Sequence, residues 1–331
     1  MSGRPKTVRR VRLKKHWGKR QSMVGYGPHC CRRDEPDVFR LFSPAIRSDA
    51  VLITGASTGI GAACALALDK IGYRVFAGVR KSADGEALQQ KAGPRLMPVR
   101  LDVTDETTML AASHTIRAMM GDAGLAGLVN NAGIGVAGPI EALPLADWRR
   151  QFEVNLFGLI RVTQTFLPLI RQGRGRIVNM GSIAGRAAMP FMAPYSASKY
   201  ALEAMTDALR IEVQPWGIRV AIIEPGAIAT PIWKKTRKET DAWDTSWSPE
   251  LKSLYQEGFS LVKETATEAG ERAQPAGLVA EAVIHALRSR FPRTRYLVGS
   301  DAKIRARLAA LLPDLLNDWL ITRIVKLPPR R

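Results

Sequence analysis

Short apolar runs alternate with longer helical patterns along most of this chain. The runs are rich in valine, isoleucine, leucine and alanine, which is typical of parallel strands buried on both faces. They cover residues 50–54, 74–79, 96–101, 127–130, 175–180, 218–223 and 295–298. Helical patterns occupy residues 62–71, 105–120, 145–172 and 195–213. This order predicts an α/β fold with one doubly wound parallel sheet, a Rossmann fold, and a ligand site along the carboxyl edge of the strands.

The predicted Rossmann domain extends over residues 48–300, with a segment at about 228–270 expected to form a substrate lid. Residues 301–331 contain two leucine-rich patterns, 304–312 and 315–327, which predict a C-terminal helical extension. We expect this extension to cover the substrate cleft or to contact a partner subunit in a homo-oligomer. Binding to a membrane surface is the remaining interpretation.

The formal net charge is +19, but it is unevenly distributed. Residues 1–47 carry 13 Lys/Arg and 3 Asp/Glu, so this segment holds +10 of the total. Because this one segment holds most of the anomaly and the other 284 residues supply only +9, we expect no nucleic-acid partner. The segment lacks apolar periodicity and predicts a disordered basic tail. A targeting peptide, a basic arm or an upstream translation start would give a similar composition. We expect a cytoplasmic protein, with organelle targeting by the tail left open.

Cysteine and histidine positions offer no metal site and no disulfide framework. The cysteines are Cys30, Cys31 and Cys64, and the four histidines are scattered. No run of about 18 apolar residues occurs, so the sequence predicts no transmembrane segment. A metal-free mechanism in a reducing compartment is therefore expected.

A glycine-rich turn follows the first apolar run. Gly55, Gly59 and Gly61 lie between this predicted strand and a helical pattern. Glycines allow a phosphate to approach the backbone, and the free amides of a helix N-terminus favour its negative charge. The pattern therefore predicts a dinucleotide pyrophosphate site. A tight strand-to-helix turn without a ligand is the alternative.

Two cations follow the second apolar run. An acidic residue at this position would bind the ribose 2′-hydroxyl and favour NAD. Here Arg80 and Lys81 follow Val79 instead, which favours a 2′-phosphate and so NADP, with NAD as the other option. A pair of solvated surface cations would look the same. Asp102, at the end of the third run, is placed to touch the adenine.

Two further asparagines stand out. Asn131 opens a segment of small residues, 131–133, against which a nucleotide could lie. Asn155 interrupts a helical pattern between two apolar residues, where asparagine is unfavourable by propensity and needs polar partners if buried. An asparagine on a wet helix face is the competing interpretation.

A candidate acid/base pair follows the fifth run. Ser182 comes directly after this run, and Tyr195 and Lys199 are four residues apart, which places them on one helix face. Free tyrosine and lysine titrate near ~10 and ~10.4, but an adjacent ammonium favours the phenolate and lowers the tyrosine pKa. The alternative is a tyrosine packed at a helix edge with a solvated lysine one turn further on.

Taken together, these motifs resemble the single-domain short-chain dehydrogenase/reductase family. The matching elements, in order, are Thr54-Gly55-x-x-x-Gly59-Ile60-Gly61, Asn130-Asn131-Ala132-Gly133, Asn155, Ser182, Tyr195-x-x-x-Lys199 and Pro225-Gly226. The resemblance covers about residues 48–300, and the combination is specific although each motif alone is not. Arg80 and segments 195–216 and 225–233 look most like the branch that includes retinol dehydrogenases and 17β-hydroxysteroid dehydrogenases.

The resemblance implies an NAD(P)-dependent oxidoreductase that interconverts an alcohol and its carbonyl. It implies that Tyr195 is the acid/base and that Lys199 lowers its pKa and holds the nicotinamide ribose. Ser182 would bind the substrate oxygen, and Asn155 would hold a water linked to Lys199. The implied cofactor contacts are Thr54, Gly55, Ser57, Thr58, Gly59, Ile60, Gly61, Arg80, Asp102, Val103, Asn131, Ala132, Gly133, Tyr195, Lys199, Pro225, Gly226, Ile228 and Thr230.

Apolar side chains surround the predicted chemistry. The expected substrate contacts are Ser182, Met189, Phe191, Tyr195 and Trp233. The lid segment adds Trp243, Trp247, Tyr255 and Phe259. Such a wall suits a hydrophobic secondary alcohol or ketone of steroid or retinoid type. The same aromatics could instead pack the lid onto the body of the protein or form a subunit contact.

Two other functions use the same scaffold. An isomerase or dehydratase would bind a nicotinamide cofactor without net turnover, and a non-enzymatic dinucleotide-binding module would need no acid/base set. Net oxidation of NADPH by a ketone distinguishes the first of these from a reductase. The intact set of Asn155, Ser182, Tyr195 and Lys199 argues against the second.

Overall fold

The fold is a seven-stranded parallel sheet in a computed structural model, which describes residues 48–233, 236, 241 and 247–327. The strand order is β3-β2-β1-β4-β5-β6-β7. The strands are β1 Ala50–Ile53, β2 Arg74–Val79, β3 Leu96–Arg100, β4 Gly127–Asn130, β5 Arg176–Met180, β6 Arg219–Pro225 and β7 Arg295–Val298. All neighbouring strands pair in parallel. The prediction of a doubly wound parallel sheet is confirmed, and each predicted strand forms within two residues of its expected bounds.

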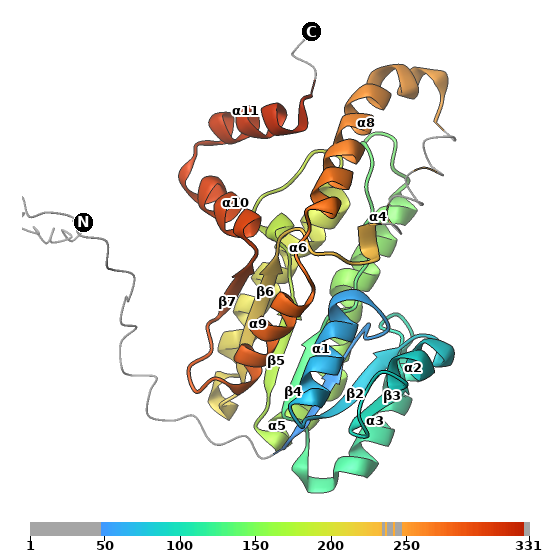
Figure 1. The fold of residues 1–331 in the computed structure, drawn as a ribbon, viewed down its shortest axis with the longest axis vertical. Helices are drawn as coiled ribbons and strands as arrows, with labels where there is room; N and C mark the ends of the chain where they lie inside the picture. Colours follow the sequence, from blue (N-terminus) through green and yellow to red (C-terminus); the bar gives the residue numbers. More distant parts are fainter. Residues whose placement is uncertain (1–47, 234–235, 237–240, 242–246, 328–331) are drawn as a thin grey trace, which may run out of the picture. The chain divides into compact units, whose positions relative to one another are not determined.

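One face of the sheet is covered by α1 (Gly59–Lys70) and α9 (Gly277–Arg288), which lie side by side in front of it in Figure 1. A buried apolar cluster joins both helices and Leu88 of α2 (Ser82–Gln89) to alternate strand residues such as Val51. Because parallel strands are buried on both faces, a second helical layer must cover the other side.

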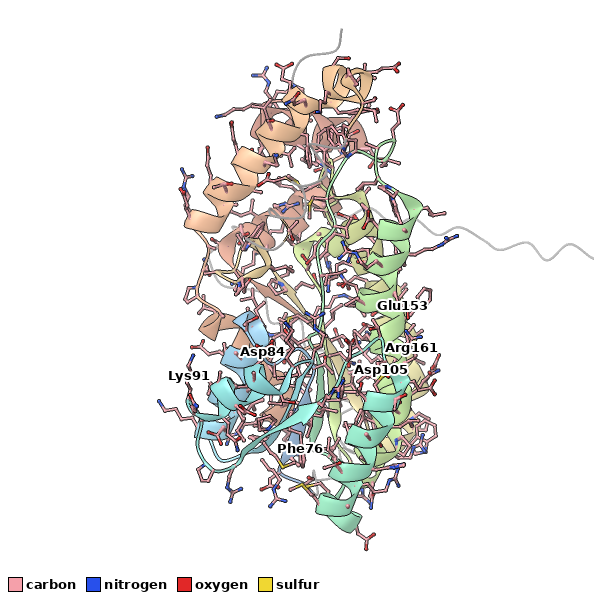
Figure 2. The ribbon with its side chains drawn as sticks, turned by 90° about the vertical axis from the view of Figure 1, so that its right-hand side faces the viewer. Phe76, Asp84, Lys91, Asp105, Glu153 and Arg161 are labelled. Carbon is pink, nitrogen blue, oxygen red and sulfur yellow. The ribbon has the colours of Figure 1, made fainter. Side chains whose placement is uncertain are left out.

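That second layer consists of α3 (Glu106–Met120), α5 (Gly158–Gly173) and α6 (Ala193–Glu212). Phe76 of β2 and Phe166 of α5 are fully buried in the cluster between these helices and the sheet. Figure 2 labels Phe76 in the lower half of the view, beside the strands. The two layers keep the strands fixed, so their carboxyl ends form a rigid edge.

The helical pattern predicted at 145–172 is divided into three parts. It begins as α4 (Leu145–Phe152), widens into a π-helical turn at η3 (Glu153–Phe157), and continues as α5. On the outer side, Glu153 and Arg161 form an ion pair across this turn and lie next to each other in Figure 2. Both side chains are partly exposed, so this pair contributes at most about 1 kcal/mol. The reason for the wide turn lies on its inner side, at Asn155.

The predicted lid segment contains α8 (Pro249–Glu271), and two further helices, α10 (Ser300–Leu311) and α11 (Asp314–Val325), follow the last strand. They belong to the same compact unit as the sheet. Short 3-10 turns complete the described structure at η2 (Gly121–Ala123), η4 (Ile183–Gly185) and η5 (Gln214–Trp216). Within the described part of the chain, no helix is both long and apolar enough to cross a membrane. The tail at residues 1–47 and Trp243 lie outside the described residues.

Candidate active site

The glycine turn lies at the carboxyl end of β1. Gly55 and Gly59 have φ angles of 63° and 59°, a backbone region that glycine adopts without strain. A Cβ atom on Gly55 would lie 2.9 Å from the Cα of Ala132, and one on Gly61 would overlap the carbonyl oxygen of Gly55. The turn therefore requires glycine at these positions. It exposes the start of α1, which has no acidic residue in its first turn, toward the carboxyl edge.

Asn131, at the end of β4, holds this turn in place. Its side-chain amide donates to the carbonyl oxygens of Thr54 at 3.0 Å and Gly55 at 3.1 Å. In return, the Thr54 hydroxyl accepts the amides of Asn131 and Ala132, both at 3.0 Å. The predicted cofactor residues of β1 and β4 are thus brought together. The Asn131 side chain supports the backbone of the cradle through its own donors.

The residues predicted to contact the adenine end of the dinucleotide follow β2 and β3. Arg80 is exposed directly after β2. Asp102 accepts the amide and the hydroxyl of Thr104 at 2.9 and 2.8 Å through one carboxylate oxygen. Val103 is buried, and its carbonyl oxygen lies where a Cβ on Gly158 would approach to 2.7 Å. These contacts fix the loop after β3 against α5.

Asn155 is buried in the π-helical turn, with all of its polar contacts satisfied inside the protein. Its Oδ1 accepts the amide of Ile134 at 2.9 Å, and its Nδ2 donates to the Ile134 carbonyl at 3.0 Å and to the Ser198 hydroxyl at 3.4 Å. Such π turns often occur at functional sites. The asparagine therefore joins the chain after β4 to α6, and the wet-face interpretation is wrong.

Gln151, one turn before Asn155, makes the same kind of contact and was missed by the sequence analysis. It is fully buried, accepts the amide of Val136 at 2.7 Å and donates to the carbonyl of Ile134 at 3.0 Å. An isolated glutamine in a polar stretch of helix gives no signal of this role. Its position four residues before Asn155, on the same face, is the only available indication.

Ser182, Tyr195 and Lys199 meet where β5 faces α6. Ser182 follows β5 by two residues, accepts the amide of Ala184 at 3.1 Å and shares a side-chain hydrogen bond with Tyr195. Lys199 is buried, and its Nζ donates to the Met180 carbonyl at 2.7 Å and lies 5.8 Å from the centroid of the Tyr195 ring. The helical pairing expected from the spacing of four residues is present, and the lysine is not solvated.

The electrostatics of this group differ from the expectation. Burial raises the pKa of Tyr195, and the hydrogen bond with Ser182 only partly offsets this effect. Burial also lowers the pKa of Lys199 to about 8, while the nearby carboxylate of Glu203 acts in the opposite direction. The two effects on the pKa of Tyr195 are burial and the Ser182 bond, so the lowering of this pKa by Lys199 stays a prediction. Desolvation of both groups is the larger effect.

A cluster of charged side chains lies next to Lys199, and sequence reasoning missed it. Glu224 of β6 is fully buried, with Arg186 Nε at 2.5 Å and Arg295 Nε at 3.6 Å. Glu203 of α6 is bound by Arg295 at 3.2 Å. Burial and the charge of Glu224 raise the pKa of Glu203 to about 7. The three segments that carry Ser182, Lys199 and the Pro225–Gly226 turn are thus joined by paired charges.

The segment after β6 passes over the glycine turn. A Cβ on Gly59 would lie 3.2 Å from the Cβ and Cγ2 atoms of Thr230. Pro225 ends β6, and the segment after it contains Gly226 and Ile228; all three are predicted cofactor contacts, and Ile228 is buried. The glycine turn after β1 and the segment after β6, which are far apart in sequence, therefore lie together at the carboxyl edge of the sheet.

The predicted apolar substrate residues come from two segments, one before α6 and one after β6. Met189, Phe191 and Trp233 are partly buried, and the Trp233 indole donates to the Ile228 carbonyl at 2.7 Å. Phe191 adopts a φ of 61°, which is strained for a bulky residue. Its ring packs 5.5 Å from that of Phe259 in α8.

Two lid aromatics are packing residues. Phe259 and Trp247 are 1% and 9% exposed, with ring centroids 5.4 Å apart. The Tyr255 hydroxyl donates to Glu141 at 2.6 Å, in the loop before α4. For these three residues, packing of the lid onto the body accounts for the contacts. Phe191 contacts the same lid helix through Phe259, whereas Met189 and Trp233 have no ring contact with the lid aromatics among the described residues.

The site can therefore hold a phosphate-containing dinucleotide at a glycine cradle and move a proton at a partly buried tyrosine. No group of His, Cys, Asp or Glu suited to a metal ion occurs among the described residues. The single described free cysteine, Cys64, is buried, and burial raises its pKa to about 12. Fold and site together define a dinucleotide-binding oxidoreductase of the Rossmann class.

Comparison with known proteins gives the family. Residues 49–241 match the family model of the short chain dehydrogenases. The chain is 39% identical over 282 residues to human retinol dehydrogenase 16, covering 83% of this chain and 88% of that protein. It is 38% identical over 284 residues to rat 17-beta-hydroxysteroid dehydrogenase type 6, covering 82% and 87%. The chain belongs to the short-chain dehydrogenase/reductase family.

A solved structure agrees with this assignment. A short chain dehydrogenase from Burkholderia cenocepacia in complex with NADP superposes with a TM-score of 0.64 at 29% identity, covering 86% of this chain and all of that one. The protein is accordingly an NAD(P)-dependent oxidoreductase of alcohols and their carbonyl compounds. The glycine turn fits such a cofactor, because it brings the start of α1, which has no acidic residue in its first turn, to the carboxyl edge of the sheet.

The proximity of Glu203 to Lys199 gives a prediction about pH dependence. The Glu203 carboxylate raises the pKa of Lys199, so Glu203→Gln should lower it below its present value of about 8. The ammonium would then lose its proton at lower pH. We expect the alkaline limb of the kcat/KM profile, measured between about pH 6 and 10, to move toward lower pH.

Asp207→Asn is the control for this variant. Asp207 is on the same helix and bonds to the same arginine, Arg295, but does not act on the pKa of Lys199. The alkaline limb of the kcat/KM profile of Asp207→Asn should coincide with that of the wild-type protein. If the alkaline limbs of the kcat/KM profiles of Glu203→Gln and the wild-type protein coincide, the Glu203 carboxylate does not raise the pKa of Lys199.

Proposed function

We propose that this enzyme interconverts a hydrophobic secondary alcohol and its ketone, or a retinoid-like or steroid-like alcohol and its carbonyl compound, with Tyr195 as the acid/base. The observation that supports this most directly is the position of Lys199, which is buried, has its Nζ 5.8 Å from the centroid of the Tyr195 ring, and donates to the carbonyl of Met180 at the end of β5. These groups lie on β5 and α6, and the glycine cradle lies two strands away along the same carboxyl edge. A dinucleotide extending from the cradle would bring its nicotinamide toward the tyrosine.

Each residue of the set has a role suited to its contacts. Ser182 orients the substrate oxygen toward the phenol, and Tyr195 gives or takes the hydroxyl proton. Lys199 supplies positive charge beneath the phenol and a donor for the nicotinamide ribose. When bound, the nicotinamide supplies the redox chemistry at the carbinol carbon.

Asn155 keeps this arrangement rigid in the proposed mechanism. Its bond to Ser198, whose hydroxyl in turn donates to the Tyr195 carbonyl at 2.7 Å, fixes the first turn of α6 relative to the chain after β4. A water beside Asn155 would connect Lys199 to solvent, as the family resemblance implies. Positioning of this kind contributes to catalysis without any group being consumed.

Tyr195→Phe tests the acid/base assignment. The variant removes the proton-transfer group and keeps the ring, so turnover should fall about a hundredfold to ten-thousandfold, while dinucleotide affinity measured by fluorescence titration stays close to that of wild type. Tyr200→Phe is the matched control, because Tyr200 is on the same helix and 45% exposed. Near-normal turnover in Tyr195→Phe would refute the assignment.

The preferred cofactor in this proposal is NADP. Arg80 and Lys81 are both exposed at the end of β2, where they can reach a 2′-phosphate, and no acidic residue lies between Arg74 and Lys81 to bind a 2′-hydroxyl. Arginine suits a phosphate because its donors form a planar fork. The bound NADP of the related bacterial structure is consistent with this preference.

Arg80→Ala tests the cofactor preference. Loss of a charge-assisted hydrogen bond should raise the KM for NADPH about tenfold to a hundredfold and leave the KM for NADH nearly unchanged. Lys91→Ala is the control. It removes an exposed cation just beyond the far end of α2 and should change neither the KM for NADPH nor the KM for NADH. Equal effects on the two cofactors would show that Arg80 does not bind the 2′-phosphate.

The proposed substrate is a bulky apolar molecule of retinoid or steroid type. Met189 and Phe191 lie between Ser182 and Tyr195, and Trp233 extends from the segment that crosses the glycine turn. The names of the two animal relatives, a retinol and a hydroxysteroid dehydrogenase, support the same class. A panel of retinoid, steroid and short aliphatic carbonyls with NADPH and NADH would identify the preferred substrate.

Trp233→Ala should discriminate among these substrates by size. Loss of apolar contact would raise the KM for a retinoid or steroid carbonyl about threefold to tenfold, with a smaller effect on a short aliphatic ketone. Trp216→Ala, which removes a 46% exposed tryptophan after α6, is the control. A uniform effect on long and short substrates would mean that Trp233 does not line the substrate site.

A further inference from the structure

The turn after β6 is held by contacts from three different segments. The amide of Gly226 donates to the Val298 carbonyl of β7 at 2.9 Å, and the carbonyl of Ala227 accepts the amide of Gln274 at 3.0 Å. The amide of Ala229 donates to the Gln274 carbonyl at 2.9 Å. These backbone contacts leave the amide of Ala227, at the centre of the turn, to a side chain.

That side chain is Asp301. Its Oδ2 accepts the Ala227 amide at 2.7 Å. A Cβ atom added to Gly226 would overlap both carboxylate oxygens of Asp301, so the turn and the carboxylate lie in direct contact. The bond connects residues 74 positions apart in the chain.

The chain is bent sharply so that Asp301 can reach the turn. β7 ends at Val298, Gly299 has a φ of 105°, and α10 begins at Ser300. Only glycine adopts this φ readily. Asp301 lies in the first turn of α10, where the helix macrodipole favours a negative charge.

α10 is itself fixed to the site, directly beyond β7 (Figure 1). Ala302 and Ala306 are buried against Ile183, the residue after Ser182. One turn after Asp301, the Arg305 guanidinium donates to the Ala187 carbonyl at 3.0 Å, in the segment that leads to Tyr195. The helix cannot shift without disturbing these contacts, so it provides a firm base for the carboxylate.

We propose that Asp301 is a positioning residue for the dinucleotide, which holds the Gly226–Ala227 turn against the nicotinamide side of the site. The inference rests on the proposed function, in which Gly226, Ile228 and Thr230 contact the cofactor. A hydrogen bond from a backbone amide to a carboxylate is stronger than one between neutral groups. Without it, the Ala227 amide loses its partner and the backbone between Gly226 and Thr230 gains freedom, which must be lost again when the cofactor binds.

Asp301→Ala and Asp301→Asn distinguish positioning from mere stabilisation. The alanine variant should raise the Kd for NADPH, measured by fluorescence titration, about tenfold or more. The asparagine oxygen can accept the same amide, so Asp301→Asn should stay within about threefold of wild type. If the alanine variant does not fold, Asp301→Ser replaces it, because serine is tolerated in a first helical turn and its hydroxyl is too short to reach Ala227.

Asp69→Ala is the matched control. Asp69 Oδ2 accepts the amide of Gly93 at 2.6 Å, which is the same type of bond, but at the end of α1 and therefore at the opposite edge of the sheet. This variant should lower the melting temperature measured without dinucleotide and leave the Kd for NADPH unchanged. Asp301→Ala should change both quantities.

The outcomes separate the inference from the function on which it rests. If wild-type protein binds neither NADPH nor NADH, the proposed function fails. If wild type binds and the folded Asp301→Ala or Asp301→Ser variant binds equally well, with only its melting temperature lowered, the positioning role is refuted. An equal rise in the Kd for NADPH in Asp301→Asn and Asp301→Ala would also refute the positioning role, because the asparagine side chain keeps an oxygen that can accept the Ala227 amide.

Discussion

The site depends on keeping the Lys199 ammonium buried beneath Tyr195. A charge removed from water is costly unless it has hydrogen bonds and a compensating charge nearby. Lys199 has one bond, to the Met180 carbonyl, and a carboxylate one turn further along α6 at Glu203. That carboxylate in turn requires Arg295 of β7. Placing one lysine therefore constrains β5, α6 and β7 together, and this explains why the charge cluster connects the end of the sheet with the catalytic helix.

A second constraint is steric and operates at β1 and β4. The glycine turn can form only where Ala132 approaches Gly55 and where Asn131 satisfies the carbonyls of Thr54 and Gly55. A buried polar ladder continues this pairing across the sheet, since Asn130 donates to Asn179 of β5 at 3.0 Å. The cradle and the acid/base centre are thus connected through the ends of β4 and β5. Rigid backbone positions of this kind suit a site in which a cofactor and a proton donor must be aligned.

The sequence allowed prediction of the strands because burial on both faces of a parallel sheet leaves apolar runs. The glycine turn and the Tyr195–Lys199 pair could also be recognised, because their spacing matches local geometry. The π-helical turn could not, since it depends on Ile134 and Ser198, which are distant in sequence. The raised pKa of Tyr195 could not be foreseen either, because spacing shows which charge is near and does not show how much water is excluded.

Asp301 illustrates the same limit for domain boundaries. A boundary after residue 300 follows the end of the strand pattern, but it separates the Gly226–Ala227 turn from the carboxylate that it contacts. α10 carries Asp301 and Arg305 one turn apart, and these bind a backbone amide after β6 and a backbone carbonyl after β5. Because both bonds originate from one helix, any displacement of α10 acts on the cofactor side and the substrate side together. α10 is therefore better regarded as part of the framework of the site than as an appendage to it.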